Sequence, residues 1–211
     1  MATINHHTPD ALLTAYAAGN LPPAFALVVA AHVSLCLECR AALEAHHTLG
    51  GLVLDGCGAK DLTAGLKSGL LARLDDPAPP VPVNTRSGVY PGPVMQALKG
   101  SAPRWKSLGM GVRQCVLSAG EEGSARLLYI PPGQSVPDHG HNGQELTLVL
   151  QGSFSDETGQ FGVGDLEIAD EDLIHTPRAD RGPPCICLAA TDAPLRFSSW
   201  LPRLIQPLFR I

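Results

Sequence analysis

The sequence predicts a multi-domain α plus β protein, with a small helical domain at residues 1–76, a proline-rich linker at 77–93 and an all-β barrel at 94–211. The first part is rich in Ala and Leu, with apolar residues at helical spacing. Prolines at positions 77, 79, 80, 82, 91 and 93 remove backbone donors and favour extended chain. The last part carries short apolar runs separated by Gly, Pro and Asp, which is typical of a small barrel or sandwich.

The composition narrows the classes of function. The chain has 211 residues and a net charge of -5, so it lacks the basic footprint of a nucleic-acid-binding protein. No apolar run approaches the roughly 18–20 residues of a membrane span. The amino terminus lacks a signal-peptide layout, and we therefore expect a cytoplasmic, reducing location. In that setting the 8 histidines and 6 cysteines indicate metal or redox chemistry more than disulfides.

Helix boundaries in the first part follow from its prolines and glycines. A short helix is expected from Asp10 to Ala18. Pro22 and Pro23 stand where a second helix begins, and the absence of Pro or Gly from Ala24 to about Leu49 predicts one long helix ended by Gly50 and Gly51. A further helix is expected from Asp61, with leucines at positions 62, 66, 70, 71 and 74.

The elements after the linker are shorter. A brief helix is expected at residues 94–99. The expected strands are residues 111–117, 125–130, 146–150, 162–168 and 185–190.

A cysteine-histidine motif lies inside the predicted long helix. His32, Cys36 and Cys39 would project at about 0°, 40° and -20° around a helix axis, and so from one face. Zn²⁺ prefers four thiolate and imidazole ligands, and His6 or His7 could supply the fourth, although spacing alone does not separate the two. The alternatives are buried apolar cysteines beside a hydrogen-bonded core histidine, or a redox dithiol without metal.

A second group of ligand types lies in the predicted β region. His139 and His141 are two residues apart, so both face one side of a strand. Glu145 can join them from the adjoining turn or strand, and His175 is the only other histidine in this half. Three imidazoles and one carboxylate suit Zn, Fe, Mn, Ni or Cu, so the ligands do not choose the metal. The alternative is a set of exposed histidines on the barrel rim.

Cys185 and Cys187 share one face of a predicted late strand. Two interpretations stay open: small buried residues in the barrel wall, or an oxidisable pair that takes part in sensing near the metal.

Two resemblances follow from these motifs. The run from Gly133 through His139, His141 and Glu145 to Gly152 resembles the first cupin motif. The second motif, which includes His175, departs from the cupin pattern at three positions: Asp170, Asp172 and Ala179.

Nearly the whole chain resembles the zinc-binding anti-sigma factors of the ChrR family, most closely from His6 to Gly19. The resemblance implies zinc ligands His7, His32, Cys36 and Cys39 in the helical domain. It also implies zinc in the cupin-like domain, where His139, His141, Glu145 and His175 are the candidate ligands.

The function implied by this resemblance is regulation of transcription without enzymatic activity. The helical domain would bind an extracytoplasmic-function sigma factor and keep it from core RNA polymerase. The cupin-like domain would sense singlet oxygen or related oxidative stress and trigger release. The alternative is a metal-dependent cupin enzyme of the dioxygenase type, in which an open metal position activates O₂ or a chelating substrate.

Overall fold

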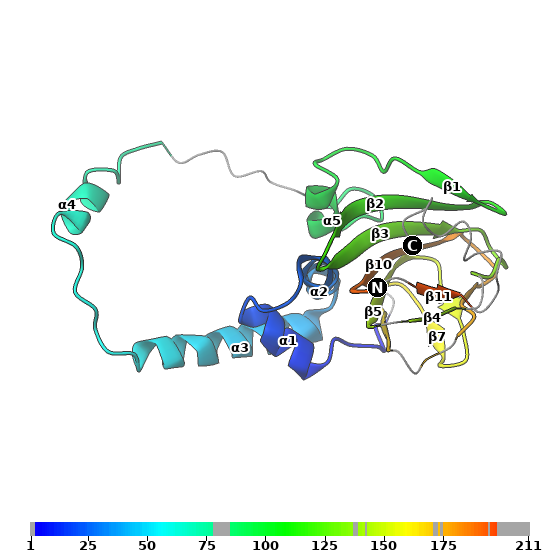
Figure 1. The fold of residues 1–211 in the computed structure, drawn as a ribbon, viewed down its shortest axis with the longest axis horizontal. Helices are drawn as coiled ribbons and strands as arrows, with labels where there is room; N and C mark the ends of the chain where they lie inside the picture. The colour runs from blue at the N-terminus through cyan, green and yellow to red at the C-terminus, as the bar shows by residue number, and fades with distance from the viewer. Residues whose placement is uncertain are drawn as a thin grey trace.

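The computed structural model describes residues 3–77, 85–136, 139–141, 143–170, 173, 175–193 and 195–197, with the backbone alone at 139–141 and 195–197. Its helices precede its strands, as the sequence predicts (Figure 1). They are α1 (Asp10–Ala17), α2 (Pro23–Leu35), α3 (Leu37–Asp55), α4 (Leu66–Leu71) and α5 (Gly92–Ala97).

The strands form antiparallel sheets. They are β1 (Lys106–Gly109), β2 (Val112–Gly120), β3 (Gly123–Ile130), β4 (His139–His141), β5 (Glu145–Gln151), β6 (Phe154–Ser155), β7 (Gln160–Phe161), β8 (Leu166–Ala169), β9 (Arg178–Ala179), β10 (Cys185–Thr191) and β11 (Leu195–Phe197). A six-stranded sheet has the order β1-β2-β3-β10-β5-β8, a three-stranded sheet the order β7-β6-β9, and β11 pairs with β4.

The predicted class, helices followed by a cupin-like β region, is confirmed, but the closed barrel is not. Among the described residues the strands form three separate sheets. The six-stranded and three-stranded sheets hold each other by side chains instead of by a continuous ladder: Val149 and Cys187 of one pack with Phe154 and Phe161 of the other. The three strands of the smaller sheet are each two residues long, and an isolated bridge between Ser135 and Arg178 links the chain after β3 to β9.

The other face of the six-stranded sheet packs against α2. Alternate residues of β10 point to opposite faces, so Leu188 packs with Phe25 and Val28 of α2, while Cys187 faces the three-stranded sheet. Phe25 is 4% exposed and Val28 is fully buried. The helical and β regions therefore share one hydrophobic core, with α2 as the helix that joins them.

The single long helix expected from Ala24 to Leu49 is wrong, because the chain bends by 116° between α2 and α3. Cys36 lies at the bend with φ -98° and ψ 113°, an extended conformation. Its thiol accepts the backbone N–H of Cys39 at 3.5 Å and so caps α3. On a straight helix, His32 and Cys39 would be separated by about 10.5 Å along the axis, too far to share one ion. The bend brings them together.

Two other expected helix boundaries are also wrong. Gly50 and Gly51 do not end α3, which continues to Asp55. Asp61 does not cap the next helix: α4 begins at Leu66, after Gly65 in a left-handed conformation (φ +85°). The predicted helix at 94–99 corresponds to α5. Of the predicted strands, that at 162–168 begins only at Leu166, because the preceding residues form a turn in which the Gly162 N–H donates to Asp165 Oδ2 at 2.8 Å.

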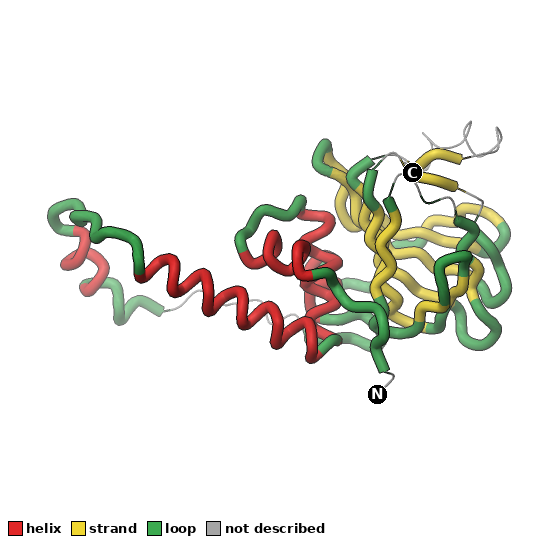
Figure 2. Tube along the Cα trace, turned by 90° about the horizontal axis from the view of Figure 1, so that it is seen from below, coloured by secondary structure: helices red, strands yellow, loops and turns green. Residues whose placement is uncertain are grey.

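The end of α3, the chain that follows it and α4 project away from the sheets (Figures 1 and 2). We call residues 49–74 the arm. Its large apolar side chains are more than half exposed. They are Leu49, Leu52, Val53, Leu54, Leu62, Leu66, Leu70, Leu71 and Leu74.

In the described part of the chain no single helix is both long and apolar enough to cross a membrane. α2 and α3 reach that length and composition only as a bent pair, and α2 contributes to the core just described.

Candidate functional site

A His₂Cys₂ cluster forms where the amino-terminal segment meets the bend between α2 and α3. The candidate ligand atoms of His7, His32, Cys36 and Cys39 all lie within 4.8 Å of one another. His7 Nδ1 lies 3.3 Å from Cys36 Sγ and 3.6 Å from Cys39 Sγ. His32 Nε2 lies 3.2 Å from Cys39 Sγ. The structure thus brings together the four residues of the first predicted site, with His7 and not His6 as the fourth.

The cluster fits a tetrahedral zinc ion. With Zn–S near 2.3 Å and Zn–N near 2.05 Å, a thiolate sulfur and an imidazole nitrogen lie about 3.6 Å apart. The observed N···S separations of 3.2–3.6 Å are close to that value. Cys36 and Cys39 are each 3% exposed and His32 is fully buried, so three of the four candidate ligands are shielded from solvent.

The electrostatics of the cluster suit a metal ligand set. Burial lowers the pKa of His32 to about 4, which keeps its imidazole neutral near pH 7. Burial raises the pKa of Cys39 to about 11, so this thiol stays protonated unless a cation stabilises the thiolate. Zinc ligation needs a neutral imidazole and a thiolate, and a bound cation would itself supply the charge that deprotonates the thiol.

The predicted second site is only partly described. His139 and His141 lie on the short strand β4, opposite Phe197 and Leu195 of β11, and their side chains are outside the described residues. Glu145 begins β5 and is 9% exposed, and its Oε1 accepts the hydroxyl of Thr147 at 2.9 Å. How these three groups lie relative to His175 therefore stays a prediction.

His175 contacts two carboxylates that the sequence analysis did not single out. Its Nδ1 lies 2.8 Å from Asp156 Oδ2 and 3.2 Å from Glu167 Oε1, and the His175 and Glu167 side chains are at most 5% exposed. An imidazole held at Nδ1 in this way directs Nε2 to the opposite side, as metal-binding histidines do. The available sequence signal was one acidic residue, Glu167, in the otherwise apolar strand Leu166–Ala169.

This triad is strongly coupled electrostatically. Burial raises the pKa of Glu167 to about 7. Burial alone would lower the pKa of His175, but its hydrogen bond to Glu167 and the neighbouring negative charges raise it to about 9. Burial opposes ionisation of Asp156 as well, yet its hydrogen bonds hold the pKa well below the ordinary value. The carboxylates thus hold a proton on His175 Nδ1, and the raised pKa places a second proton on Nε2 near pH 7, which a metal bound there would have to displace.

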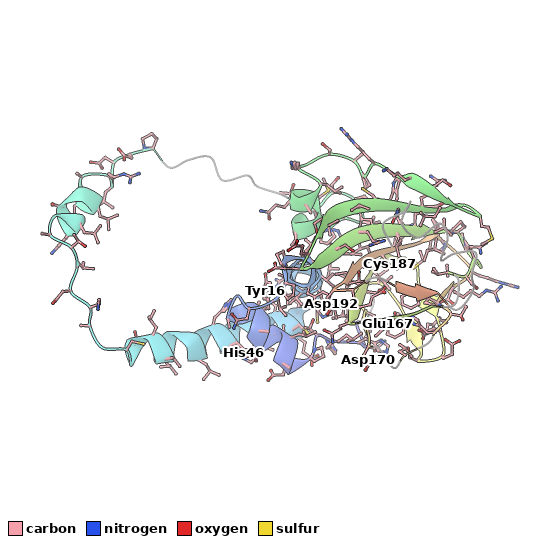
Figure 3. The ribbon with its side chains drawn as sticks, viewed as in Figure 1. Tyr16, His46, Glu167, Asp170, Cys187 and Asp192 are labelled. Carbon is pink, nitrogen blue, oxygen red and sulfur yellow. The ribbon has the colours of Figure 1, made fainter. Side chains whose placement is uncertain are left out.

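Cys185 and Cys187 point to the same side of β10, with their sulfurs 3.4 Å apart. Both are buried, at 0% and 1% exposed. The hydrogen bond with Cys185 and burial raise the pKa of Cys187 well above its ordinary value. Protonated, solvent-excluded thiols react slowly, which favours the interpretation of these residues as packing groups over that of a reactive pair. Figure 3 shows Cys187 and Glu167 within the β region.

Other histidines and cysteines have separate surroundings. His46 lies where α3 passes α1 (Figure 3), and its Nε2 is 2.9 Å from Asp10 Oδ1. His6 packs its ring against Phe161, with 4.4 Å between ring centroids. Cys57 is exposed, and its thiol is hydrogen bonded to the carbonyl of Val53.

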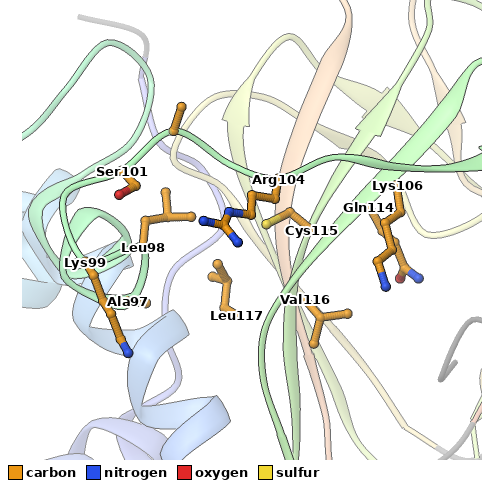
Figure 4. Close-up of a pocket in the computed structure, with 11 residues that line it drawn as sticks. Ala97, Leu98, Lys99, Ser101, Arg104, Lys106, Gln114, Cys115, Val116 and Leu117 are labelled. Atoms are coloured by element: carbon orange, nitrogen blue, oxygen red, sulfur yellow. The ribbon is translucent and has the colours of Figure 1, made fainter.

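A pocket of about 710 Å³ lies between α5 and β2 (Figure 4). Lys99, Arg104 and Lys106 stand at its walls, with Cys115 and Leu117 on β2. No carboxylate is among its described lining residues. The pocket shares no residue with either cluster, so it is not part of the candidate metal centres.

Known proteins resemble this chain along its length. The family described as ChrR cupin-like domain matches residues 95–193. The anti-sigma-E factor ChrR of Cereibacter sphaeroides is 55% identical over 212 residues, covering 99% of this chain and 100% of that protein.

Among solved structures, the crystal structure of Rhodobacter sphaeroides SigE in complex with the anti-sigma ChrR matches with a TM-score of 0.79 and 53% identity, covering 90% of this chain and 100% of that chain. An RmlC-like cupin from Ralstonia eutropha matches with a TM-score of 0.42 and 19% identity over 47% of this chain and 69% of that one.

Proposed function

This chain belongs to the ChrR family of anti-sigma factors, and from that premise we propose that it binds an extracytoplasmic-function sigma factor and keeps it from core RNA polymerase. The observation that carries the proposal is similarity over the whole chain to a protein solved in complex with SigE. A relative that is regulatory along its full length favours this function over the cupin-enzyme alternative. The partner is then a protein and not DNA, in keeping with the net charge of -5.

The arm is the surface proposed to hold the sigma factor. Nine large apolar side chains between Leu49 and Leu74 are more than half exposed, although burying each would be favourable by roughly 1.5–3 kcal/mol. Apolar side chains gathered on one projecting segment mark a protein interaction site. The arm stands clear of the sheets, so a partner could lie against it without displacing the core (Figure 1).

The His₂Cys₂ cluster is proposed as a structural zinc site with ligands His7, His32, Cys36 and Cys39. A bound Zn²⁺ would supply a cross-link between the amino-terminal segment and the bend. Cys36 caps α3 and so sets the direction in which α3 leaves the core. The cluster therefore orients the arm that begins on the same helix.

The β region is proposed as the sensor. His139, His141, Glu145 and His175 would hold a second metal, zinc by analogy with the family, and Asp156 and Glu167 would orient His175. Singlet oxygen or a related oxidant is the proposed stimulus.

We also infer a cytoplasmic location for the protein. The proposed organisation of the chain is a helical region at residues 1–76, a linker at 77–93 and a cupin-like region at 94–211.

Binding of the sigma factor can be tested with substitutions in the arm. The double variant Leu66→Asp, Leu70→Asp should lose co-purification of a co-expressed extracytoplasmic-function sigma factor, because it places charge on two exposed apolar positions of α4. Met110→Asp is the matched control, since Met110 is 70% exposed but lies between β1 and β2. Retention of the sigma factor by the double variant, or its loss from the control, would refute the arm as the docking surface.

A further inference from the structure

The turn before β8 is hydrogen bonded to the amino-terminal segment that carries His7. Asp165 Oδ1 accepts the backbone N–H of Asn5 at 2.6 Å and that of His6 at 2.9 Å. The N–H of Leu166 donates to the carbonyl of His6 at 3.1 Å. Burial would raise the pKa of Asp165, but these backbone donors, with that of Gly162, lower it, so the carboxylate is charged at neutral pH. The β region thus fixes the chain immediately before His7.

The same turn also holds a second residue of the His₂Cys₂ cluster. His32 Nδ1 lies 2.9 Å from the carbonyl oxygen of Gly164. A carbonyl oxygen can only accept, so Nδ1 carries the proton and Nε2 presents its lone pair to the cluster, 3.2 Å from Cys39 Sγ. The orienting hydrogen bond of this histidine therefore comes from a residue 132 positions away.

Gly164 permits the close approach of the Ile4 side chain to the turn. Its φ of +94° is in the region that favours glycine, and an added Cβ would lie 2.6 Å from Cδ1 of Ile4. The side chain of Ile4 thus lies directly over the turn. Packing and hydrogen bonds act at the same place.

The strand that follows this turn contacts the other proposed centre. Glu167 is two residues after Asp165, and its Oε1 lies 3.2 Å from His175 Nδ1. Glu167 is 4% exposed and Asp165 is 2% exposed, so both carboxylates make their contacts away from solvent. Four consecutive residues, 164–167, therefore contact the amino-terminal segment, His32 and His175.

We propose that residues 164–167 are a shared positioning element, in which Gly164 and Asp165 hold His32 and the segment of His7 in place for metal, while Glu167 ties the same strand to His175. A displacement of β8 at the sensor would then change the positions of His32 and of the segment that carries His7. The inference rests on the proposed function only in taking both clusters as metal sites.

The first test measures metal retention in the full chain without any sigma factor. With Co²⁺ in place of Zn²⁺, thiolate-to-cobalt absorption reports the His₂Cys₂ centre alone, because the predicted cupin ligands include no cysteine. Loss of this absorption to excess EDTA should be about 10-fold or more faster in Asp165→Asn, since removing a group that orients a ligand weakens metal binding by about that factor. The amide cannot present two accepting oxygens to the donors at Asn5, His6 and Gly162.

Asp180→Asn is the matched control. Asp180 also accepts several hydrogen bonds within the β region, but its partners are the side chains of Ser153, Ser155 and Gln160. This variant should release Co²⁺ at the wild-type rate. Equal rates for Asp165→Asn and wild type, or equal acceleration by both variants, would overturn the proposal. If Asp165→Asn fails to fold, Ile4→Ala serves in its place. It leaves the buried carboxylate intact and should also accelerate the release of Co²⁺.

The second test addresses the link through β8. Glu167→Gln should speed hydrogen exchange of the Asn5 and His6 amides, which donate to Asp165 Oδ1. Unchanged exchange at these two amides would show that the strand does not connect the centres. Because neither test uses a sigma factor, failure here leaves the proposed binding function standing, and failure to bind a sigma factor leaves this inference standing.

Discussion

At the scale of single residues, Cys36 has two roles that one thiol fulfils. It lies in extended conformation between two helices, caps α3 through the N–H of Cys39, and presents its sulfur 3.3 Å from His7 Nδ1. A serine could cap the helix, but its hydroxyl is a poor ligand for zinc. Cysteine at this position therefore joins the local fold to the proposed metal site.

Substituting Cys39 tests the site without removing the cap. Cys39→Ser should remove one zinc equivalent from the purified protein and weaken binding to the sigma factor at least about tenfold, because the metal holds the segment against the bend. Zinc content by elemental analysis and binding by titration measure the two effects. Cys57→Ser, at an exposed cysteine outside the cluster, should change neither. Full binding with zinc lost would show that the metal is dispensable there.

The residues of the first cluster were accessible from the sequence because its motif is local and the family resemblance supplied His7. The carboxylates around His175 were not. Asp156 lies in a turn and Glu167 in a strand, and only the packing of the two sheets places both within 3.2 Å of His175 Nδ1. The contact of Asp165 with the amino terminus spans 160 residues for the same reason.

At the scale of elements, propensity located most helices and central strands but not the bend. No Pro or Gly separates α2 from α3, so sequence punctuation gives no break. The bend depends on a side-chain cap and on the cluster around it, both of which are tertiary features. Conversely, Gly50 and Gly51 are tolerated inside α3, since each costs only about 1 kcal/mol relative to alanine.

The element that joins the two regions is α2, and its burial predicts a large effect on stability. Phe25→Ala should lower the free energy of unfolding by about 3–5 kcal/mol, because Phe25 packs in the core shared with the six-stranded sheet. Val53→Ala, at a valine 72% exposed in the arm, should change it by less than about 0.5 kcal/mol. Chemical denaturation of the full chain measures both, and a small effect of Phe25→Ala would contradict the shared core.

At the scale of the whole molecule, the proposed functions occupy different places. The arm projects from one end of the molecule (Figures 1 and 2). The His₂Cys₂ cluster lies at the bend where α3 begins, and the contacts of His175 with Asp156 and Glu167 lie in the β region. In the proposed mechanism, an event at the sensor would reach the arm through β8, the cluster and α3 in turn. The proposed release is then a shift between bound and free populations of the sigma factor.

This arrangement predicts that inhibition and response can be separated. Glu145→Ala should leave sigma-dependent transcription low in unstressed cells, because Glu145 belongs neither to the arm nor to the His₂Cys₂ cluster, and should abolish the rise on exposure to singlet oxygen. A reporter gene under a sigma-dependent promoter measures both states. Glu122→Ala, at an exposed carboxylate in the turn between β2 and β3, should respond as wild type does. If Glu145→Ala instead released the sigma factor constitutively, the intact sensor would itself be required for inhibition, and the two regions would act as one binding unit instead of as sensor and inhibitor.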